Sequence, residues 1–326
     1  MNRITLLSET IFINAYEHSK SRLLTALIIV SLFAIHGYRK KSLSTSGVIA
    51  AWCVGMITCI SSWSFAVSLL SFYFSSSYLT KYKASIKKKI EENHLLGKFY
   101  KQPPFKLASY SNTYHLKSIG GQRNYVQVLS NSLNAAVCGL VFLLFSFDPR
   151  ITFIDSDYKF DAFLICAVVG HYAACNGDTW ASELGILNKK KPILVTTLKP
   201  VPTGTNGGVS LVGILASIAG GSFIGIIYYF TSALFNNGHA LKSQIPIIYL
   251  GTFAGLFGSL IDSLMGATLQ YSGWNKKKLV VTNNPPSKLN SQDIDHICGV
   301  DLLDNHQVNF LSSLLISMIC EKGFYK

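Results

Sequence analysis

Charged side chains are scarce in this chain. Only 14% of its 326 residues are Asp, Glu, Lys or Arg, whereas 49% are hydrophobic and the mean hydropathy is +0.33. A chain this long and this apolar exceeds what one water-soluble core can bury. Several stretches approach the ~20 apolar residues that a bilayer span needs. The composition therefore excludes an ordinary soluble domain and predicts an integral membrane protein.

Several sequence signals are missing. The seven Cys include no Cys-x-x-Cys pair and lie mostly in apolar runs, which favours small buried hydrophobes over metal ligands or disulfides. The N-terminal segment, residues 1–22, has no small-residue cleavage site, so we expect the first span to act as the insertion signal. No part of the sequence is typical of a Ser-His-Asp triad, a zinc site or a haem site.

Acidic residues are outnumbered, with 16 Asp and Glu against 29 Lys and Arg, and the net charge is +13. Nucleic-acid binding would explain such a charge, but the basic residues lie in loops between apolar segments and no recognition module accompanies them. Basic loops on the cytosolic side of a membrane explain it better. We therefore expect a lipid bilayer, and no nucleic acid, as the partner.

The apolar runs predict an all-α, polytopic membrane bundle of seven or eight transmembrane helices. Residues 23–80 hold three spans, at 23–37, 46–60 and 63–79, and a basic loop occupies residues 81–124. The core membrane domain, 125–326, carries the polar motifs. Its predicted spans are 125–147, 160–175, 209–235, 245–269 and a short run at 308–319, for which a full crossing is left open.

The charges also predict an orientation. When the spans alternate, three basic loops fall on one side: residues 81–123, the loop with Lys189 to Lys199, and Lys276 to Lys278. The segment 148–161, which has four Asp, falls on the other. Because positive loops mark the cytosolic side, we expect the motifs to face the cytosol. The expected location is the endoplasmic reticulum or another endomembrane.

One polar motif, residues 176–183, stands at the end of an apolar run. Such groups are costly in or beside hydrocarbon unless they hold a cation, a substrate or one another. The carboxylates of Asp178 and Glu183, with the amide of Asn176, form a hard-cation ligand set, and Ser182 lies beside them. A helix N-cap is the alternative, but a cap uses only one of these groups. We therefore predict a metal site.

A further acid lies within the span 245–269. Asp262 belongs to a helical stripe with Gly251, Gly255, Gly258 and Gly266, and Ser263 follows it. The glycines permit close helix packing, but an acid in such a stripe needs a partner, and a shared cation is the simplest one. We predict that Asp178, Glu183 and Asp262 meet at one Mg²⁺ and act in catalysis.

A glycine-rich loop directly before the span 209–235 is the candidate phosphate site. Glycines let backbone amides approach an anion, and the next helix adds its dipole. The loop is not a Walker A sequence, and an ordinary loop leading into the span is the alternative. The residues expected near nucleotide or phosphate are Lys199, Gly204, Thr205, Asn206, Gly207, Gly208 and Arg123. The alternative interpretation of Arg123 is a residue that flanks the next span and faces the lipid headgroups.

Asp304, Asn305 and His306 precede the last apolar run. His306 is a candidate for orienting a nucleotide or accepting a proton, with a solvated helix cap as the alternative. His171, inside a span, is expected to be a hydrogen-bonded histidine at a helix contact.

The motif segments 175–185, 201–210, 258–270 and 304–310 together resemble the transmembrane protein 19 family, also called domain of unknown function 92. That family is similar to the plant phytyl-phosphate kinase, and the order of its motifs resembles dolichol kinases and phosphatidate cytidylyltransferases. The resemblance implies Mg²⁺, a nucleoside triphosphate with CTP as one candidate, and an isoprenyl monophosphate. It places Asp178 and Asp262 on metal and Thr205 to Gly208 near phosphate. The Lys-Thr-x-Glu-Gly loop of dolichol kinases is here Gly204 to Gly208, without its lysine and glutamate.

Two hypotheses of different classes follow. The first is a Mg²⁺-dependent membrane kinase that acts on an isoprenyl monophosphate. The alternative is a multi-pass transporter or lipid-moving protein whose intramembrane acids line a path. The sequence leaves the prenyl chain length, the nucleotide and the oligomeric state open.

Overall fold

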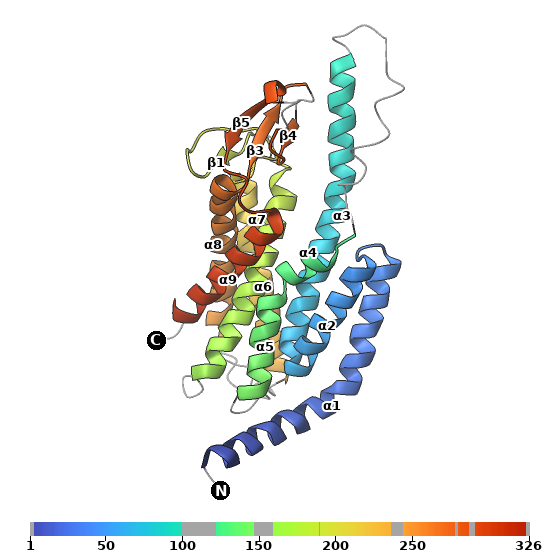
Figure 1. The fold of residues 1–326 in the computed structure, drawn as a ribbon, viewed down its shortest axis with the longest axis vertical. Helices are drawn as coiled ribbons and strands as arrows, with labels where there is room; N and C mark the ends of the chain where they lie inside the picture. The colour runs from blue at the N-terminus through green and yellow to red at the C-terminus, as the bar shows by residue number, and fades with distance from the viewer. Residues whose placement is uncertain are drawn as a thin grey trace.

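The computed structural model describes residues 3–99, 122–146, 159–188, 190–235, 244–277, 280–286 and 291–323. Within these ranges the side chains of 3–19, 21, 83–99 and 321–323 are not described. Most of the described chain is helical, and most helices run between the same two ends of one bundle (Figure 1).

The N-terminal group consists of α1 (Arg3–Arg39), α2 (Thr45–Ser61) and α3 (Trp63–Phe99). The side chain of Ser44 accepts a hydrogen bond from the amide of Gly47 and caps the start of α2. Ser62, in an extended conformation, is the single residue between α2 and α3. Helices α2 and α3, which are in contact, therefore form a helical hairpin at the place where the spans 46–60 and 63–79 were predicted.

The predicted span 125–147 is divided into α4 (Tyr125–Ser130) and α5 (Leu133–Phe145). The break lies at Asn131 and Ser132, whose side chains donate to the carbonyl oxygens of Gln127 (2.8 Å) and Val128 (2.6 Å). Such short polar side chains compete with the helical hydrogen bonds of the backbone. Hydropathy alone did not reveal this break.

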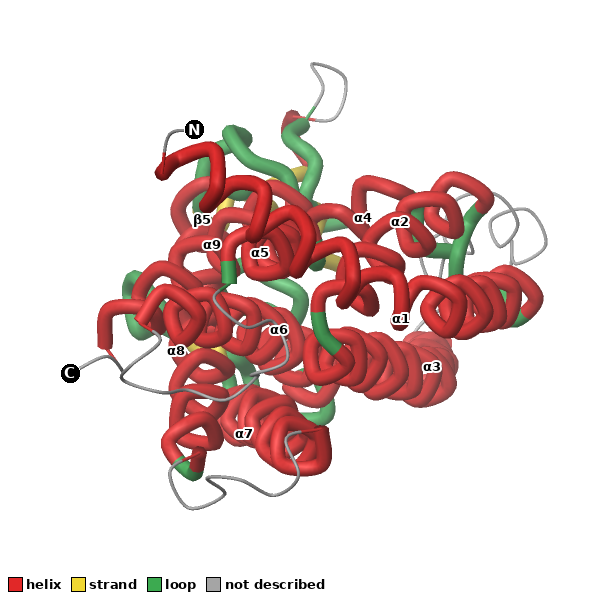
Figure 2. The backbone as a smooth tube through the Cα atoms, turned by 90° about the horizontal axis from the view of Figure 1, so that it is seen from below, coloured by secondary structure: helices red, strands yellow, loops and turns green. Residues whose placement is uncertain are grey.

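The core is built on α6 (Lys159–Gly185), which contacts α3, α5, α7 (Leu211–Phe235), α8 (Pro246–Leu269) and α9 (Asn305–Gly323). Seen along the bundle, α6 lies in the middle of these helices (Figure 2). Helices α6, α7 and α8 approach one another at glycines. A Cβ added to Gly177 would lie 2.7 Å from the Cα of Gly255, and one added to Gly255 would lie 2.6 Å from the Cα of Gly221.

Two small sheets correct the all-α prediction. Strand β1 (Ile193–Leu194) pairs antiparallel with β2 (Gly208–Val209). Strands β3 (Ser272–Asn275), β4 (Val280–Thr282) and β5 (Ile294–Cys298) form an antiparallel sheet in the order β4-β3-β5. A short 3₁₀ helix, Ser291–Asp293, precedes β5. These strands lie in the polar segments between α6 and α7 and between α8 and α9, where no apolar run forces a helix.

Four of the described helices are long and apolar enough to cross a bilayer: residues Arg22–Arg39 of α1, and α6, α7 and α8. Helices α2 and α5 are apolar but shorter, with 17 and 13 residues. The structure therefore supports a helical multi-pass membrane protein with four full-length candidate spans among the described residues, and the number of seven or eight spans stays a prediction. Helices α2 and α5 are short, and serines and tyrosines within α3 and polar residues at the start and end of α9 lower their hydropathy.

The polar segments gather at one end of the bundle. The sheets and the upper part of α3 lie at the top of Figure 1, and α4 lies lower, beside the middle of α3. Lys190, Lys199 and Lys276 belong to these segments, so the described parts of the basic loops lie at the same end, as predicted. Residues 100–121 of the first basic loop and most of the acidic segment 148–161 lie outside the described residues.

The glycine contacts predict a difference between two alanine substitutions. Gly255→Ala places its methyl group against the backbone of α7, which cannot move aside easily, so we expect a loss of about 1–3 kcal/mol in stability. Gly139→Ala is the control, because its nearest neighbour, Ser61 Oγ, would be 3.4 Å away and alanine favours a helix by up to about 1 kcal/mol. Thermal unfolding of the purified protein in detergent measures both. Equal unfolding temperatures would contradict the role given to Gly255.

Candidate functional site

Two carboxylates meet in the seam between α6, α8 and α9. Asp178 accepts a hydrogen bond from Ser259 Oγ at 3.2 Å, and Asp262 accepts one from Ser312 Oγ at 3.1 Å. Ser259 precedes Asp262 by less than one turn of α8, and the two acids are close enough to interact electrostatically. The structure therefore brings Asp178 and Asp262 to one depth of the bundle, at its polar end.

Close helix packing creates this pair. Gly177, the residue before Asp178, lies against the backbone of Gly255, and Gly258 lies against Ala174. Because α6 and α8 touch along small residues, the side chain of Asp178 reaches Ser259 on the facing helix. Glycines that the sequence indicated as packing residues thus also set the position of the acids.

The surroundings of the pair consist of hydroxyl and amide groups. With its amide oriented to satisfy its neighbours, Asn309 of α9 donates to Asp262 Oδ2 (3.2 Å) and to the backbone oxygen of Asn305 (2.9 Å). Carboxylate, hydroxyl and carbonamide oxygens are ligands that Mg²⁺ accepts. Two adjacent carboxylates repel each other unless a cation or a proton lies between them. This donor set fits a hard divalent cation.

Glu183 is separated from this pair, which corrects the predicted cluster of three carboxylates. It follows Asp178 by five positions, so the two side chains point about 140° apart around α6. Its Oε1 accepts a hydrogen bond from Thr80 Oγ1 of α3 at 3.2 Å. In the described part of the chain, no group of three or more His, Cys, Asp or Glu side chains is placed to hold a metal.

Asn176 links helices, and its position does not support the predicted role as a metal ligand. The side chain is fully buried, and its oxygen accepts hydrogen bonds from Ser75 (2.8 Å) and Ser76 (3.4 Å) of α3. Its amide nitrogen donates to the backbone oxygen of Gly220 in α7 at 2.7 Å. Asn176 therefore ties α6 to two neighbours on the face opposite Asp178.

The glycine-rich loop uses its backbone amides internally. The amides of Thr205, Asn206 and Gly208 donate to Pro202 O (3.2 Å), Ser272 Oγ (3.1 Å) and Thr205 O (3.0 Å). These bonds favour the alternative of a structural loop over the predicted phosphate site.

Two glycines of this loop have positive φ, +94° at Gly204 and +73° at Gly207. Gly207 packs on the end of α8, where a Cβ would collide with Ala267 and with the backbone oxygen of Ser263. Ser263 thus contacts the loop through its backbone carbonyl group. Lys199, which was expected near nucleotide or phosphate, is exposed.

Arg123 lies between α3 and α4. It donates from Nη1 to Ser77 Oγ (3.2 Å), and its guanidinium lies 5.7 Å from the centre of the Tyr73 ring. Burial lowers the pKa of Arg123, and electrostatic interactions with Tyr73 and with the carboxylate of Glu183 oppose that shift. An arginine stays protonated under such conditions, so this position carries a fixed positive charge.

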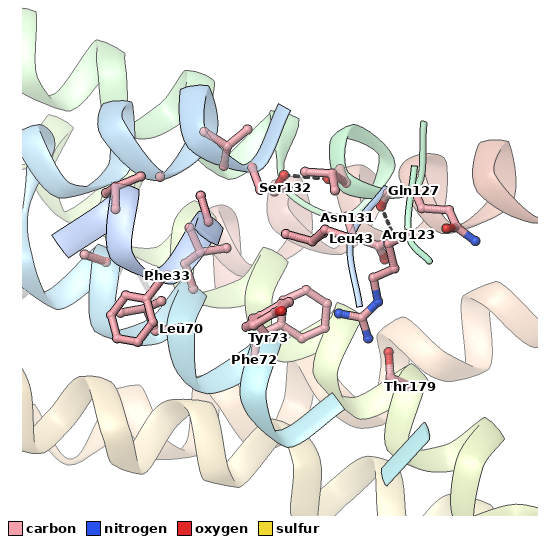
Figure 3. A pocket seen from close by; sticks show the side chains of 18 of the residues that line it. Phe33, Leu43, Leu70, Phe72, Tyr73, Arg123, Gln127, Asn131, Ser132 and Thr179 are labelled. Carbon is pink, nitrogen blue, oxygen red and sulfur yellow. Dashed lines mark hydrogen bonds between the residues drawn. The ribbon is translucent and has the colours of Figure 1, made fainter. Parts of the chain in front are cut away.

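Arg123 stands at the polar end of a cavity of about 220 Å³. Figure 3 shows the apolar part, with Phe33, Leu70 and Phe72, leading to Arg123 and Thr179. The polar lining consists of Arg123, Gln127, Asn131, Ser132, Thr179, Asn305, His306 and Asn309. Neither Asp178 nor Asp262 lines the cavity, but Asn309 both lines it and reaches Asp262, so the cavity and the carboxylate pair are linked through this amide.

Sequence reasoning missed several residues of this site. Ser312, Asn309 and Tyr73 were not among the predicted site residues, and neither were the amides Gln127 and Asn131. The available signal was the presence of Asn131 and Ser132, and of the run Ser75 to Ser77, inside otherwise apolar segments. Polar groups in such segments need partners.

The motif before α9 is divided between two roles. Asp304 caps the helix, because its Oδ1 accepts hydrogen bonds from the amides of His306 (2.7 Å) and Gln307 (2.9 Å). Asn305 and His306 line the cavity. Ser182 is exposed and donates to the backbone oxygen of Thr179 at 3.0 Å.

Known proteins resemble this chain along most of its length. Protein PGR of Arabidopsis thaliana is 38% identical, covering 91% of this chain and 94% of the relative. The membrane protein MJ0933 of Methanocaldococcus jannaschii is 27% identical, covering 86% and 93%. The membrane protein sll0875 of Synechocystis is 34% identical over about half of each chain. No solved structure matches.

The family comparison agrees with the resemblance noted from the motifs. Residues 28–317, which include all helices from α2 to α8 and both carboxylates, match the family described as integral membrane protein DUF92. The chain therefore belongs to the DUF92 family of integral membrane proteins.

Proposed function

We propose that this protein is a membrane-embedded phosphotransferase that transfers the terminal phosphoryl group of a nucleoside triphosphate to an isoprenyl monophosphate. One observation carries the proposal: the Asp178–Asp262 pair is linked through Asn309 to the polar, arginine-bearing end of a cavity whose other walls are apolar. A lipid-soluble phosphate needs such a combination of apolar wall, fixed cation and metal-binding carboxylates. CTP is one candidate nucleotide.

The proposed reaction requires positioning and charge neutralisation more than acid–base chemistry. An oxygen of the acceptor phosphate bonds to the γ-phosphorus, the bond from that phosphorus to the β–γ bridging oxygen breaks, and the nucleoside diphosphate leaves. An ionised acceptor needs no base. Asp178 and Asp262 would hold Mg²⁺, which neutralises phosphate charge when bound. Ser259 and Ser312 orient the two carboxylates through their hydrogen bonds.

We also propose that the polar end of the bundle faces the cytosol from an endomembrane. The support is that the described basic residues of three loops share this end, together with both carboxylates. Nucleotides and Mg²⁺ are available on that side.

The carboxylate pair predicts that Asp178→Asn and Asp262→Asn each reduce Mg²⁺-dependent transfer by roughly 100-fold or more, since each removes one metal-binding charge. The measurement is formation of the isoprenyl diphosphate by purified protein in detergent or nanodiscs. Unfolding temperatures of both variants serve as the control for folding. Undiminished turnover in both folded variants would rule out the roles given to these residues.

The separation of Glu183 predicts a milder effect for Glu183→Gln. Because Glu183 contacts Thr80 of α3 and lies away from the pair, we expect its loss to reduce transfer by less than about tenfold. The Mg²⁺ concentration for half-maximal rate should stay unchanged, whereas it should rise in the aspartate variants. A loss as severe as that of Asp178→Asn would indicate that Glu183 also binds the metal.

One observation also favours the alternative of a transporter or lipid-moving protein. The interruption between α4 and α5 lies at the cavity, and interrupted helices beside a binding site are common in transporters. Flux of an isoprenyl phosphate into proteoliposomes without nucleotide distinguishes the two. Flux without any product of transfer would favour the alternative.

A further inference from the structure

We propose that the cavity between α1, α2 and α3 is the binding site of the acceptor, with a single apolar chain among these helices and the phosphate head on Arg123. Identifying the occupant as the acceptor rests on the proposed function. The site itself is defined by its apolar lining and by the positive charge of Arg123 at its polar end.

The apolar part of the cavity has a floor. Its lining runs along α2 from Ala51 to Cys59, and eight residues of helix span about 12 Å. At the lower end, the lining residues Val30, Cys59 and Ala66 belong to a packed cluster that also contains Ala26 and Met56. With C–C bonds of about 1.5 Å, this depth accommodates an extended chain of at least about eight carbons, the length of the main chain of a geranyl group.

The upper end of the cavity is suited to an anion. Among the described residues, the guanidinium of Arg123 makes one hydrogen bond, to Ser77, whereas a guanidinium carries five N–H donors in a planar fork. Such a fork matches two phosphate oxygens at once. Glu183 lies near enough to interact electrostatically with Arg123, yet its Oε1 accepts a hydrogen bond from Thr80. The guanidinium therefore keeps donors for a ligand.

One amide links the proposed position of the phosphate head to the carboxylate pair. Asn309 belongs to the cavity wall, and its amide reaches Asp262 Oδ2 at 3.2 Å. A phosphate held by Arg123 would therefore share the polar end of the cavity with Asn309. The walls contributed by α1, α2 and α3 are mostly apolar, which suits a chain without polar groups.

The contribution of the phosphate head to binding is tested by measuring ligand affinity without nucleotide or metal. We expect the purified full-length protein in nanodiscs to bind geranyl monophosphate at least about tenfold more tightly than geraniol, which has the same chain and no phosphate. Arg123→Gln should remove this difference, Arg123→Lys should retain part of it, and Ile49→Phe, at an exposed position of α2, should retain all of it. Equal binding of the two ligands by the native protein, or full affinity in Arg123→Gln, would overturn the proposal.

The position of the ligand's apolar chain is tested by filling the cavity with a larger side chain. Val54→Phe, on α2, adds bulk within the lining and should weaken geranyl monophosphate binding by at least about tenfold. It should leave binding of dimethylallyl monophosphate, whose chain is half as long, within about twofold. Ile49→Phe is the control, because Ile49 is also on α2 but 64% exposed. Ala66→Val, a smaller addition at the floor, should shift the preference in the same direction and replaces Val54→Phe if that variant does not fold.

These outcomes separate the site from the reaction. Binding that depends on Arg123 and Val54, without any phosphoryl transfer, would keep the cavity as a site for an anionic amphiphile and reject the proposed enzyme. Transfer with native affinity in both variants would keep the enzyme and reject this cavity as its acceptor site.

Discussion

Backbone-to-backbone contact among α6, α7 and α8 is the constraint on which the site depends. Gly177, Gly221 and Gly255 lie so close that a methyl group on any of them would meet the backbone of a neighbouring helix. In a bilayer, where apolar side chains gain little from leaving lipid, such contacts and interhelical hydrogen bonds hold helices together. The same close approach allows Asp178 on α6 to reach Ser259 on α8 and to lie near Asp262.

Polar groups of the bundle are divided between two faces of α6. On one face, Asn176 and Glu183 accept hydrogen bonds from hydroxyl groups of α3. On the other, Asp178 faces α8. Buried polar groups are tolerated where they have partners, and these hydroxyls supply them. One face thereby fixes how α3 sits against α6, while the other carries the acids proposed to bind metal.

The cavity is lined by residues of the N-terminal helices and by residues of the core of the bundle. Its apolar walls come from α1, α2 and α3, and its polar end combines Arg123 with residues of α4, α6 and α9. The interruption between α4 and α5 places Asn131 and Ser132 in this wall. A chain-and-head ligand would therefore contact both halves of the protein, which gives the N-terminal helices a role in the proposed reaction.

The sequence by itself determined the membrane class, the family, the positions of most helices and the gathering of the polar segments at one end. Hydropathy and charge carry this information because they depend on composition along the chain. Helical periodicity also placed Asn176 and Glu183 on one stripe and Asp178 on another. Only the tertiary structure decided which helix each stripe meets, and hence that Asp178 joins Asp262 whereas Glu183 joins Thr80. The bond from the Asn206 amide to Ser272 and the cavity around Arg123 likewise arise from segments far apart in sequence, so no local pattern reveals them.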